Sequence, residues 1–210
     1  MSADIFIDGE AGTTGLGIAQ RLAAMPGISL IRLDEAHRKD ESARAEAMGR
    51  ADITVLCLPD DAARRAVAIA PPGTRILDAS TAHRTMPGWV YGFPELAPRQ
   101  AREIAAAPLV ANPGCYATGA IALLRPLIDA GMLPLGYDAT IHAVSGYSGG
   151  GKAMIAAHEA EAGPSFELYA LGLQHKHIPE IMEYGGLAAR PVFIPSVRGR
   201  RPHDNREILS

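Results

Sequence analysis

The sequence predicts an α/β protein in which a Rossmann-like, doubly wound parallel sheet precedes a second, α+β domain. Two observations carry this prediction. Short apolar segments alternate with helical segments from residue 4 to residue 111, the pattern of repeated βα units. The first apolar segment leads into a glycine-rich turn and then a helix, the order found where a parallel sheet binds a dinucleotide. The alternation ends near residue 115, so we expect domains at 1–114 and 115–197 and an irregular tail at 198–210.

Composition narrows the class of protein and of partner. Of the 210 residues, 48% are hydrophobic and 20% charged, as in soluble globular proteins. A net charge of −3 gives no attraction to nucleic acid, and no apolar segment is long enough to span a membrane. The N-terminus lacks a secretory signal, and the two cysteines do not indicate a disulfide framework. We therefore expect that the partners are small molecules and that the protein is located in the reducing cytoplasm.

The first βα unit contains the candidate phosphate-binding loop. Residues 4–8 form a short apolar strand, and a helical pattern follows through Met25. The backbone between them is suited to a pyrophosphate, because its glycines allow close approach and the helix N-terminus favours an anion. The candidate cofactor-binding residues here are Gly9, Gly12, Thr13, Thr14 and Gly15. Together with Gly17 their spacing departs from the standard G-x-G-x-x-G, so a tight turn without a ligand stays open.

The second strand, expected at 28–34, ends on an acid and is followed by bases. Asp34 lies at the distance expected for a carboxylate that binds a ribose 2′-hydroxyl. Arg38 follows within a short basic run and is suited to a 2′-phosphate. The local sequence therefore leaves NAD and NADP both open, and a solvated charged loop without a ligand is a third interpretation.

The alternation continues with strands at 53–58 and 74–79 around a helix at 60–70. In a parallel sheet the ends of these strands share one edge with the glycine loop, and ligands bind at that edge. Ser80 and Arg84 follow the later strand, so we assign Ser80 to the cofactor and Arg84 to a phosphate or carboxylate of the substrate. A surface arginine in a loop is the alternative. A helix at 98–107 and a strand at 108–111 complete the domain.

Cys115 is the candidate nucleophile. It follows the strand at 108–111 and Asn112-Pro113-Gly114, and a helix is expected at 117–124. The N-terminus of a helix favours an anion, so a cysteine placed there becomes thiolate more readily. A small buried residue in an ordinary turn is the alternative for Cys115, and it is our interpretation of Cys57 within its apolar strand.

Two further segments carry polar chemistry. After a strand at 140–144, the glycine-rich residues 145–152 lead to a helix at 153–162, and Ser145, Gly146 and Lys152 are suited to an anion unless the loop is a linker. If residues 175–177 are extended, His175 and His177 share one face. No further ligand cluster completes a metal site, so acid–base work is expected of one of them. An exposed pair at the start of a helix is the alternative.

These stretches together resemble the shorter bacterial type of N-acetyl-gamma-glutamyl-phosphate reductase, an enzyme family of arginine biosynthesis. The resemblance covers residues 3 to about 197 and depends on five stretches in order, at 9–16, 78–84, 112–116, 146–152 and 175–180. It implies the two-domain architecture of the semialdehyde and glyceraldehyde-phosphate dehydrogenases, and a homo-oligomer. It also implies NADP(H) as cofactor, an acyl phosphate as substrate and a thioester intermediate on Cys115. For the acid–base group it favours His175, with His177 as the second candidate. It places Asn112 at the nicotinamide or at the developing oxyanion.

The sequence departs from the family pattern after Val197. Family members continue with more strands and a final helix, whereas residues 198–210 are polar, basic and without periodicity. We expect this tail to be poorly ordered, and the missing strands to leave an exposed sheet edge and apolar surface on Val192, Phe193 and Ile194. Two other functions stay open: another acyl-phosphate or semialdehyde dehydrogenase, and a nucleotide-binding protein without catalysis.

Overall fold

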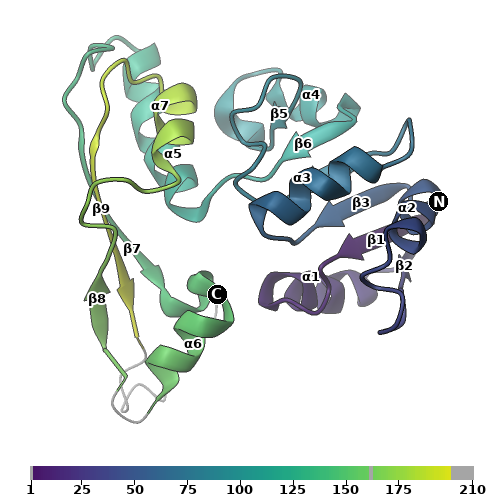
Figure 1. The fold of residues 1–210 in the computed structure, drawn as a ribbon. Coiled ribbons are helices and arrows are strands. Elements are labelled where there is room, and N and C mark those ends of the chain that lie inside the picture. Colours follow the sequence, from purple (N-terminus) through teal and green to yellow (C-terminus); the bar gives the residue numbers. More distant parts are fainter. Residues whose placement is uncertain (1, 161–162, 200–210) are drawn as a thin grey trace. The chain divides into compact units, whose positions relative to one another are not determined.

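The chain divides into two compact units, Met1–Gly114 and Cys115–Ser210 (Figure 1). The structure is a computed structural model, and it describes residues 2–160 and 163–199. Among these residues, no helix has both the length and the apolar character needed to cross a bilayer. Each unit has its own sheet and its own helices, and each is described by itself.

The first unit is built on a six-stranded sheet in which every neighbouring pair is parallel. The strand order is β2-β1-β3-β4-β6-β5. The strands are β1 (Ala3–Asp8), β2 (Ile28–Ile31), β3 (Ile53–Leu56), β4 (Ile76–Asp78), β5 (Val90–Tyr91) and β6 (Leu109–Ala111). The chain adds β2 on one side of β1 and β3 on the other, so the direction of winding reverses at β1. The expected doubly wound parallel sheet is confirmed, and ligands bind such sheets at this reversal.

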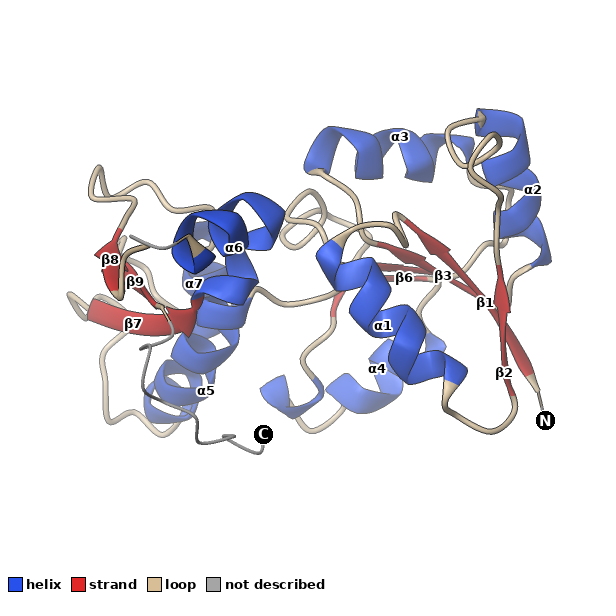
Figure 2. Cartoon of the chain, turned by 90° about the horizontal axis from the view of Figure 1, so that it is seen from below, coloured by secondary structure: helices blue, strands red, loops and turns tan. Residues whose placement is uncertain are grey.

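Helices cover both faces of this sheet, as Figure 2 shows. On one face lie α1 (Thr13–Ala23) and α4 (Gln100–Ala106), and on the other lie α2 (Glu41–Arg50) and α3 (Asp60–Ile69). Side chains alternate along each strand, so Ile5 and Ile7 pack with Ala19 of α1 while Phe6 packs with Met48 of α2. A short 3-10 helix, η1 (Pro94–Leu96), precedes α4.

Three local features of this unit differ from the sequence expectations. Helix α2 was missed: Asp40 caps it by accepting from the Ala43 N–H at 2.8 Å, but its only buried side chains are Ala47 and Met48, so the apolar signal is weak. Strand β2 ends at Ile31, the last residue paired with β1, rather than at 34. Helix α1 begins at Thr13, so Gly15 and Gly17 are helical residues.

The second unit contains a mixed three-stranded sheet and three α-helices within its described residues. The strand order is β7-β9-β8, with β7 parallel and β8 antiparallel to β9. The strands are β7 (Thr140–Gly146), β8 (Phe166–Leu168) and β9 (Val192–Arg198), and the helices are α5 (Cys115–Asp129), α6 (Gly151–Glu159) and α7 (Ile178–Gly185), with a 3-10 helix η2 (Tyr147–Gly150). Helices α5 and α7 pack against each other, and both carry fully buried isoleucines. This arrangement is the α+β domain that the sequence predicted.

Here too some boundaries and one packing expectation were wrong. Helix α5 runs from Cys115 to Asp129 instead of 117–124, and α6 begins at Gly151 and ends at Glu159. Phe193 was expected to lack cover, yet it is 0% exposed because it packs against Tyr116 and His175. Val192 is 42% exposed, as expected. Strand β9 continues to Arg198 and Gly199 follows it, while residues 200–210 of the predicted tail lie outside the described residues.

Candidate functional site

The glycine loop follows β1 and is shaped by two glycines with different roles. Gly9 adopts φ +92°, a conformation that disfavours any side chain, and a Cβ there would also collide with the backbone of Cys57. Gly15 lies in the first turn of α1, where a Cβ would collide with the Gly9 carbonyl oxygen and come within 2.8 Å of Glu10 Cα. Between them, the Gly12 N–H donates to the Gly9 carbonyl at 3.0 Å. The loop is therefore a tight turn that brings backbone to the start of α1.

A cavity of about 510 Å³ lies beside this loop, within the first unit. Its lining includes Gly9 and Glu10 of the loop, Arg32 after β2, and Arg38 and Lys39 of the following turn. Arg38, a predicted cofactor-binding residue, therefore lines the same cavity as the glycine loop. Gly12 is the N-cap of α1 and makes no side-chain cap, and Thr14 is exposed in its first turn. Backbone N–H groups at such a helix start are suited to a phosphate.

The charged side chains around the cavity differ in whether another residue of the same region engages them. Glu10 pairs with Arg32 at 3.1 Å. Asp34 accepts from the His37 backbone N–H at 3.0 Å, and the same Oδ1 lies 2.7 Å from His37 Nδ1. The side-chain hydrogen bond with His37 is the largest cause that holds the pKa of Asp34 below its usual value. Asp34, the acid expected to bind a ribose, is therefore hydrogen-bonded within its own turn, while Arg38 and Lys39 line the cavity.

Asp8, at the end of β1, is a buried member of this site that the sequence analysis missed. Its Oδ2 accepts from Arg44 of α2 twice, from Nη2 at 2.6 Å and from Nε at 3.0 Å. The Asp8 side chain also lines the cavity. An acid at the end of the strand before the glycine loop was visible in the sequence, but its partner belongs to the helix that was not predicted.

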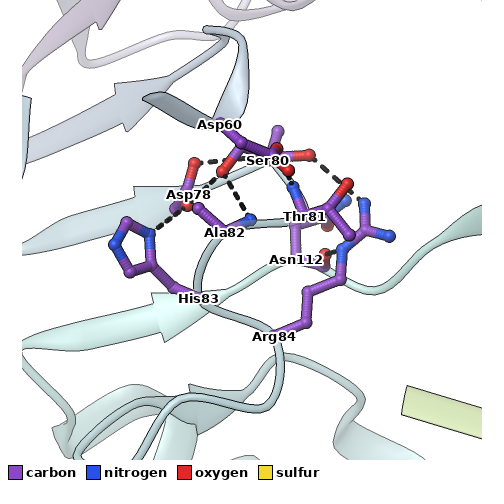
Figure 3. A network of polar contacts seen from close by, with 9 residues as sticks. Asp60, Asp78, Ser80, Thr81, Ala82, His83, Arg84 and Asn112 are labelled. Atoms are coloured by element: carbon purple, nitrogen blue, oxygen red, sulfur yellow. Dashed lines mark hydrogen bonds and ion pairs between the residues drawn. The ribbon is translucent and has the colours of Figure 1, made fainter. Parts of the chain in front are cut away.

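A second polar cluster lies where β4 ends, as Figure 3 shows. Asp78 is 0% exposed and its carboxylate accepts from the Ser80 N–H at 2.9 Å and from Ser80 Oγ at 2.6 Å. Asp78 Oδ2 is also 2.6 Å from His83 Nδ1, and the His83 ring stacks on Trp89 with centroids 4.2 Å apart. Ser80, a predicted cofactor residue, is therefore buried and bonded to Asp78. Asp78 and His83 were not predicted as site residues.

Arg84 follows this cluster and contacts the segment that leads to Cys115. Its Nε donates to the Asn112 carbonyl oxygen at 2.9 Å, and its Nη2 donates to the Ala79 carbonyl oxygen at 3.3 Å (Figure 3). The backbone N–H of Asn112 donates to the Asp78 carbonyl at 2.7 Å. The structure thus brings Arg84 and Asn112 together through a contact between distant segments that no sequence pattern predicts.

The two cysteines occupy different environments. Cys115 is the first residue of α5 and is an exposed residue. Cys57 is half-buried after β3, and burial, with smaller contributions from the charges of Asp78 and Asp8, raises its pKa to about 11. Cys57 is consequently a thiol at neutral pH, which agrees with its assignment as a packing residue, and Cys115 is the thiol available for chemistry.

Both candidate histidines are buried among aromatic side chains of the second unit. His175 and His177 lie in a turn before α7, not in an extended segment, and their rings meet edge to face with centroids 4.6 Å apart. They are 9% and 5% exposed, so the alternative of an exposed pair at a helix start is wrong. Tyr116 lies within 5.8 Å of each ring, measured between centroids.

The hydrogen bonds of His175 define how its ring is held. Its Nδ1 accepts the His177 backbone N–H at 3.1 Å, so in the neutral ring the proton is on Nε2. That Nε2 lies 3.3 Å from Tyr169 Oη. The loop between Tyr169 and His175 holds two non-glycine residues at positive φ, Ala170 at 50° and Leu173 at 57°. Such conformations persist only where surrounding contacts enforce them.

Two tyrosines of this cluster were missed by the sequence analysis. Tyr116 Oη donates to the Ser196 carbonyl at 2.7 Å. Burial raises the pKa of Tyr116, the hydrogen bonds with Tyr169 and Ser145 lower it, and the charge of Cys115 raises it. Burial, followed by Tyr116 and the charge of Cys115, also raises the pKa of Tyr169. Tyr116 therefore lies near Tyr169, Ser145 and Cys115 within this unit.

The glycine-rich segment 145–152 is largely regular rather than a loop. Ser145 and Gly146 end β7, Tyr147–Gly150 form η2, and Lys152 is an exposed residue in the first turn of α6. Tyr147 stacks on His158 with centroids 5.4 Å apart and donates to Glu159 at 3.0 Å. Within residues 2–160 and 163–199, no group of three or more His, Cys, Asp or Glu side chains is arranged for a metal.

Family models match both units of the chain. Residues 31–104 match the semialdehyde dehydrogenase NAD binding domain, and residues 115–199 match the semialdehyde dehydrogenase dimerisation domain. The first unit is therefore an NAD-binding type of domain, in agreement with the glycine loop and the cavity beside it.

Curated relatives of this chain are N-acetyl-gamma-glutamyl-phosphate reductases. Reductase 2 of Pseudomonas putida is 58% identical over 195 residues, which are 91% of this chain and 62% of the relative. The reductase of Burkholderia cenocepacia is 54% identical, with 91% and 63% covered, and that of Brucella anthropi is 54% identical over 209 residues, with 96% and 67% covered. The chain spans a little under two thirds of the length of the first two relatives.

Solved structures with a similar fold are aspartate semialdehyde dehydrogenases. Enzyme II of Vibrio cholerae, complexed with ASA, matches with a TM-score of 0.62 and 15% identity over 93% of this chain and 70% of that one. The Candida albicans enzyme with NADP matches with a TM-score of 0.63 and 12% identity over 95% and 68%. At these identities the likeness concerns the fold alone.

Proposed function

Because this chain belongs to the N-acetyl-gamma-glutamyl-phosphate reductase family, we propose that it takes part in the reduction of N-acetyl-gamma-glutamyl phosphate to the semialdehyde. The observation that carries the proposal is an exposed Cys115 as the first residue of α5, in a chain 58% identical to one such reductase over 91% of its length. The reaction consumes the acyl phosphate, one hydride and one proton, and it releases the aldehyde and inorganic phosphate.

Cys115 is the nucleophile in this proposal. Its thiolate attacks the acyl carbon, the bond from that carbon to the phosphate oxygen breaks, and a thioester forms on Sγ. When bound, NADPH supplies the hydride that reduces this thioester. The tetrahedral alkoxide then expels the Cys115 thiolate and leaves the aldehyde. The start of α5 favours the thiolate in both steps, because the N–H groups and dipole of a helix N-terminus favour an anion.

His175 is assigned the proton that the leaving phosphate requires. In the neutral ring the proton is on Nε2, because Nδ1 accepts the His177 N–H at 3.1 Å. A proton taken up on Nδ1 makes the imidazolium, which gives its Nε2 proton to the leaving phosphate oxygen and returns to a neutral ring. Tyr169, at 3.3 Å from Nε2, holds the ring at the other side. The His175 ring thus has one defined tautomer and one defined direction. His177, whose backbone fixes that tautomer, is the second candidate.

The charges around the first-unit cavity favour NADPH over NADH. Asp34, the natural partner of a ribose 2′-hydroxyl, is engaged by His37 in its own turn. Arg38 and Lys39 line the cavity and supply positive charge suited to a 2′-phosphate. Gly9, Gly12, Thr13, Thr14 and Gly15 are assigned to the pyrophosphate, and Ser80 and Asn112 to the nicotinamide end.

The substrate's phosphate and carboxylate are assigned to Ser145, Gly146 and Lys152 of the second unit. Ser145 is the last residue but one of β7 and hydrogen-bonds with Tyr116. Lys152 is exposed in the first turn of α6, where a helix N-terminus adds to its charge. A substrate contact by Arg84 also stays a prediction. The match to a dimerisation domain supports a homo-oligomer, and a reactive thiol suits the reducing cytoplasm.

The test is the Cys115→Ser variant of this chain, assayed with the acyl phosphate and NADPH. We expect turnover to fall by at least about a thousandfold, because a hydroxyl at this position has no comparable nucleophile form. NADPH affinity, measured by titration, should stay at the parent's value. Turnover of the serine variant near the parent's rate would exclude covalent catalysis, and NADPH binding without turnover in the parent would favour the binding protein.

A further inference from the structure

The chain that leaves β6 is held on both sides of a single residue, Asn112. Its backbone N–H donates to the Asp78 carbonyl at 2.7 Å, and its carbonyl oxygen accepts from Arg84 Nε at 2.9 Å. Arg84 Nη2 reaches the Ala79 carbonyl at 3.3 Å. The planar guanidinium therefore joins the end of β4 to the end of β6 through two backbone carbonyls, a geometry that lysine cannot reproduce.

Arg84 is itself held by a buried pair. It is 7% exposed, and the preceding residue, His83, places Nδ1 at 2.6 Å from Asp78 Oδ2. His83 cannot turn away without losing its stacking on Trp89, and Asp78 also accepts from Ser80. A carboxylate buried this deeply requires its hydrogen-bond partners, so the pair fixes the turn from 79 to 84. Figure 3 shows this network around the turn.

The residues after Asn112 lead directly to Cys115, the proposed nucleophile. Pro113 has a fixed φ, so holding the Asn112 carbonyl restricts the backbone as far as Pro113, two residues before Cys115. We propose that Arg84 is a positioning residue that fixes the segment 112–114, and through it the presentation of Cys115 as the first residue of α5, with the Asp78–His83 pair holding Arg84. The inference rests on the proposed function to the extent that Cys115 is the nucleophile there.

The test uses the alkylation rate of Cys115 by iodoacetamide in the full chain at pH 7.5. Iodoacetamide is neutral and has neither phosphate nor carboxylate, so the loss of a substrate contact by Arg84 leaves its reaction unchanged. Mass spectrometry of the digested protein reports Cys115 and Cys57 separately. Cys57 is the internal control, because its raised pKa, about 11, keeps it unreactive while the first unit is folded.

Three variants separate the position of Cys115 from the charge at residue 84. Arg84→Lys keeps the positive charge but loses the fork to the two carbonyls, and we expect Cys115 to react roughly two- to fivefold more slowly, the range of an anion's interaction with a helix N-terminus. His83→Leu removes the donor to Asp78 and should slow Cys115 to a similar extent. His83→Asn keeps an N–H donor near the position of Nδ1 and should retain the parent's rate.

Each outcome decides between distinct conclusions. The inference is supported if Cys115 is alkylated more slowly in Arg84→Lys and in His83→Leu while Cys57 stays unreactive. His83→Asn should then show the alkylation rate of the parent. Parent rates in Arg84→Lys and His83→Leu overturn it and leave the proposed function standing. If His83→Leu exposes Cys57 to alkylation it has unfolded, and Arg84→Lys then decides alone. If Cys115 of the parent reacts no faster than glutathione, the nucleophile assignment fails, and with it the proposed function.

Discussion

The two units of this chain build their candidate sites in different ways. In the first unit, strands such as β3 are covered on both faces, and the site follows from backbone: a glycine at positive φ, a helix start and the ends of neighbouring strands. In the second unit the residues of β7 alternate between exposed and half-buried and β8 is exposed throughout. Its site follows from side chains that meet across large sequence separations, such as Tyr116 with Phe193 and His175.

This difference determines whether a core mutation changes only the stability of a unit or also the geometry of its candidate site. A core substitution in the first unit is expected to change stability without touching the glycine loop, whose proposed ligand contacts are backbone atoms at the sheet edge. In the second unit the core and the site share residues, because Phe193 packs against both Tyr116 and His175. Stability and site geometry should therefore be coupled in the second unit and separable in the first.

The strongest test of this difference compares two buried residues truncated to alanine. Phe193 and Met48 are both 0% exposed, one in each unit. We expect Phe193→Ala to cost about 3–5 kcal/mol and Met48→Ala about 2–5 kcal/mol. The chain's single tryptophan, Trp89, lies in the first unit, so its fluorescence reports that unit while far-UV circular dichroism reports both.

The coupling predicts opposite patterns for these two variants in urea. Phe193→Ala should shift the circular dichroism transition, leave most of the Trp89 transition in place and lower turnover in native buffer. Met48→Ala should shift the Trp89 transition and leave turnover per folded molecule unchanged. Equal shifts of both signals in both variants would show that the units unfold as one body, and normal turnover in Phe193→Ala would break the coupling.

A smaller effect is expected from a single methyl group in the glycine loop. Gly15→Ala places a Cβ against the Gly9 carbonyl and 2.8 Å from Glu10 Cα, both backbone, so the loop must move. We expect a cost of about 1–3 kcal/mol and a clear loss of NADPH affinity in a fluorescence titration. Gly17→Ala, two residues on in the same helix, meets no atom within 4 Å and should gain up to about 1 kcal/mol from helix propensity. Equal NADPH affinity in the two variants would contradict the role of close backbone approach.

The same difference explains how much the sequence predicted. In the first unit the parallel, doubly wound sheet and the glycine loop at its edge follow from alternation and from the rule that strand ends share an edge. The exception is α2, whose two buried residues give little periodicity. Arg44, the partner of Asp8, lies on this helix and was therefore not predicted either. The pair of Asp78 and His83 is five residues apart in sequence, yet it needed the geometry of the turn to be recognised.

In the second unit the sequence supplied residue types but not partners. Cys115 at a helix start and two neighbouring histidines were identifiable, whereas the turn that holds the histidines, their burial and the role of Tyr169 were not. The burial depends on packing between segments far apart in sequence, for which Tyr116 and Ser196, separated by 80 positions, are an example. Tyr169 is only six residues from His175, but the loop geometry that brings the two together has no pattern in the sequence. The covered Phe193 has the same origin, since its neighbours come from α5 and from the turn before α7.

The smallest expected effect concerns alkaline pH, where the two units differ in their titrating groups. In the second unit burial raises the pKa of Tyr116, Tyr169 and Tyr184, for Tyr184 to about 12, with the charges of Glu183 and Glu180 adding to it. In the first unit the corresponding group is the Cys57 thiol, with its pKa raised from 9.0 to about 11. A raised folded-state pKa means that the folded protein holds the proton more tightly than the unfolded chain does. The stabilisation is therefore complete below the unfolded pKa and is lost as the pH rises through the folded one.

For Tyr184 this loss falls between pH 10 and about 12, and for Cys57 between pH 9 and about 11. Urea midpoints measured from pH 8 to pH 12 should decline in the Trp89 signal from pH 9, and in the circular dichroism signal chiefly above pH 10. Tyr184→Phe removes one titrating phenol, so its circular dichroism midpoint should decline less steeply above pH 10, while its Trp89 decline stays that of the parent. Comparing slopes rather than absolute midpoints removes any constant cost of the lost hydroxyl. An unchanged slope in Tyr184→Phe would show that this phenol is not desolvated in the folded unit, and would weaken the distinction between a second unit held by buried aromatic groups and a first unit held by its backbone.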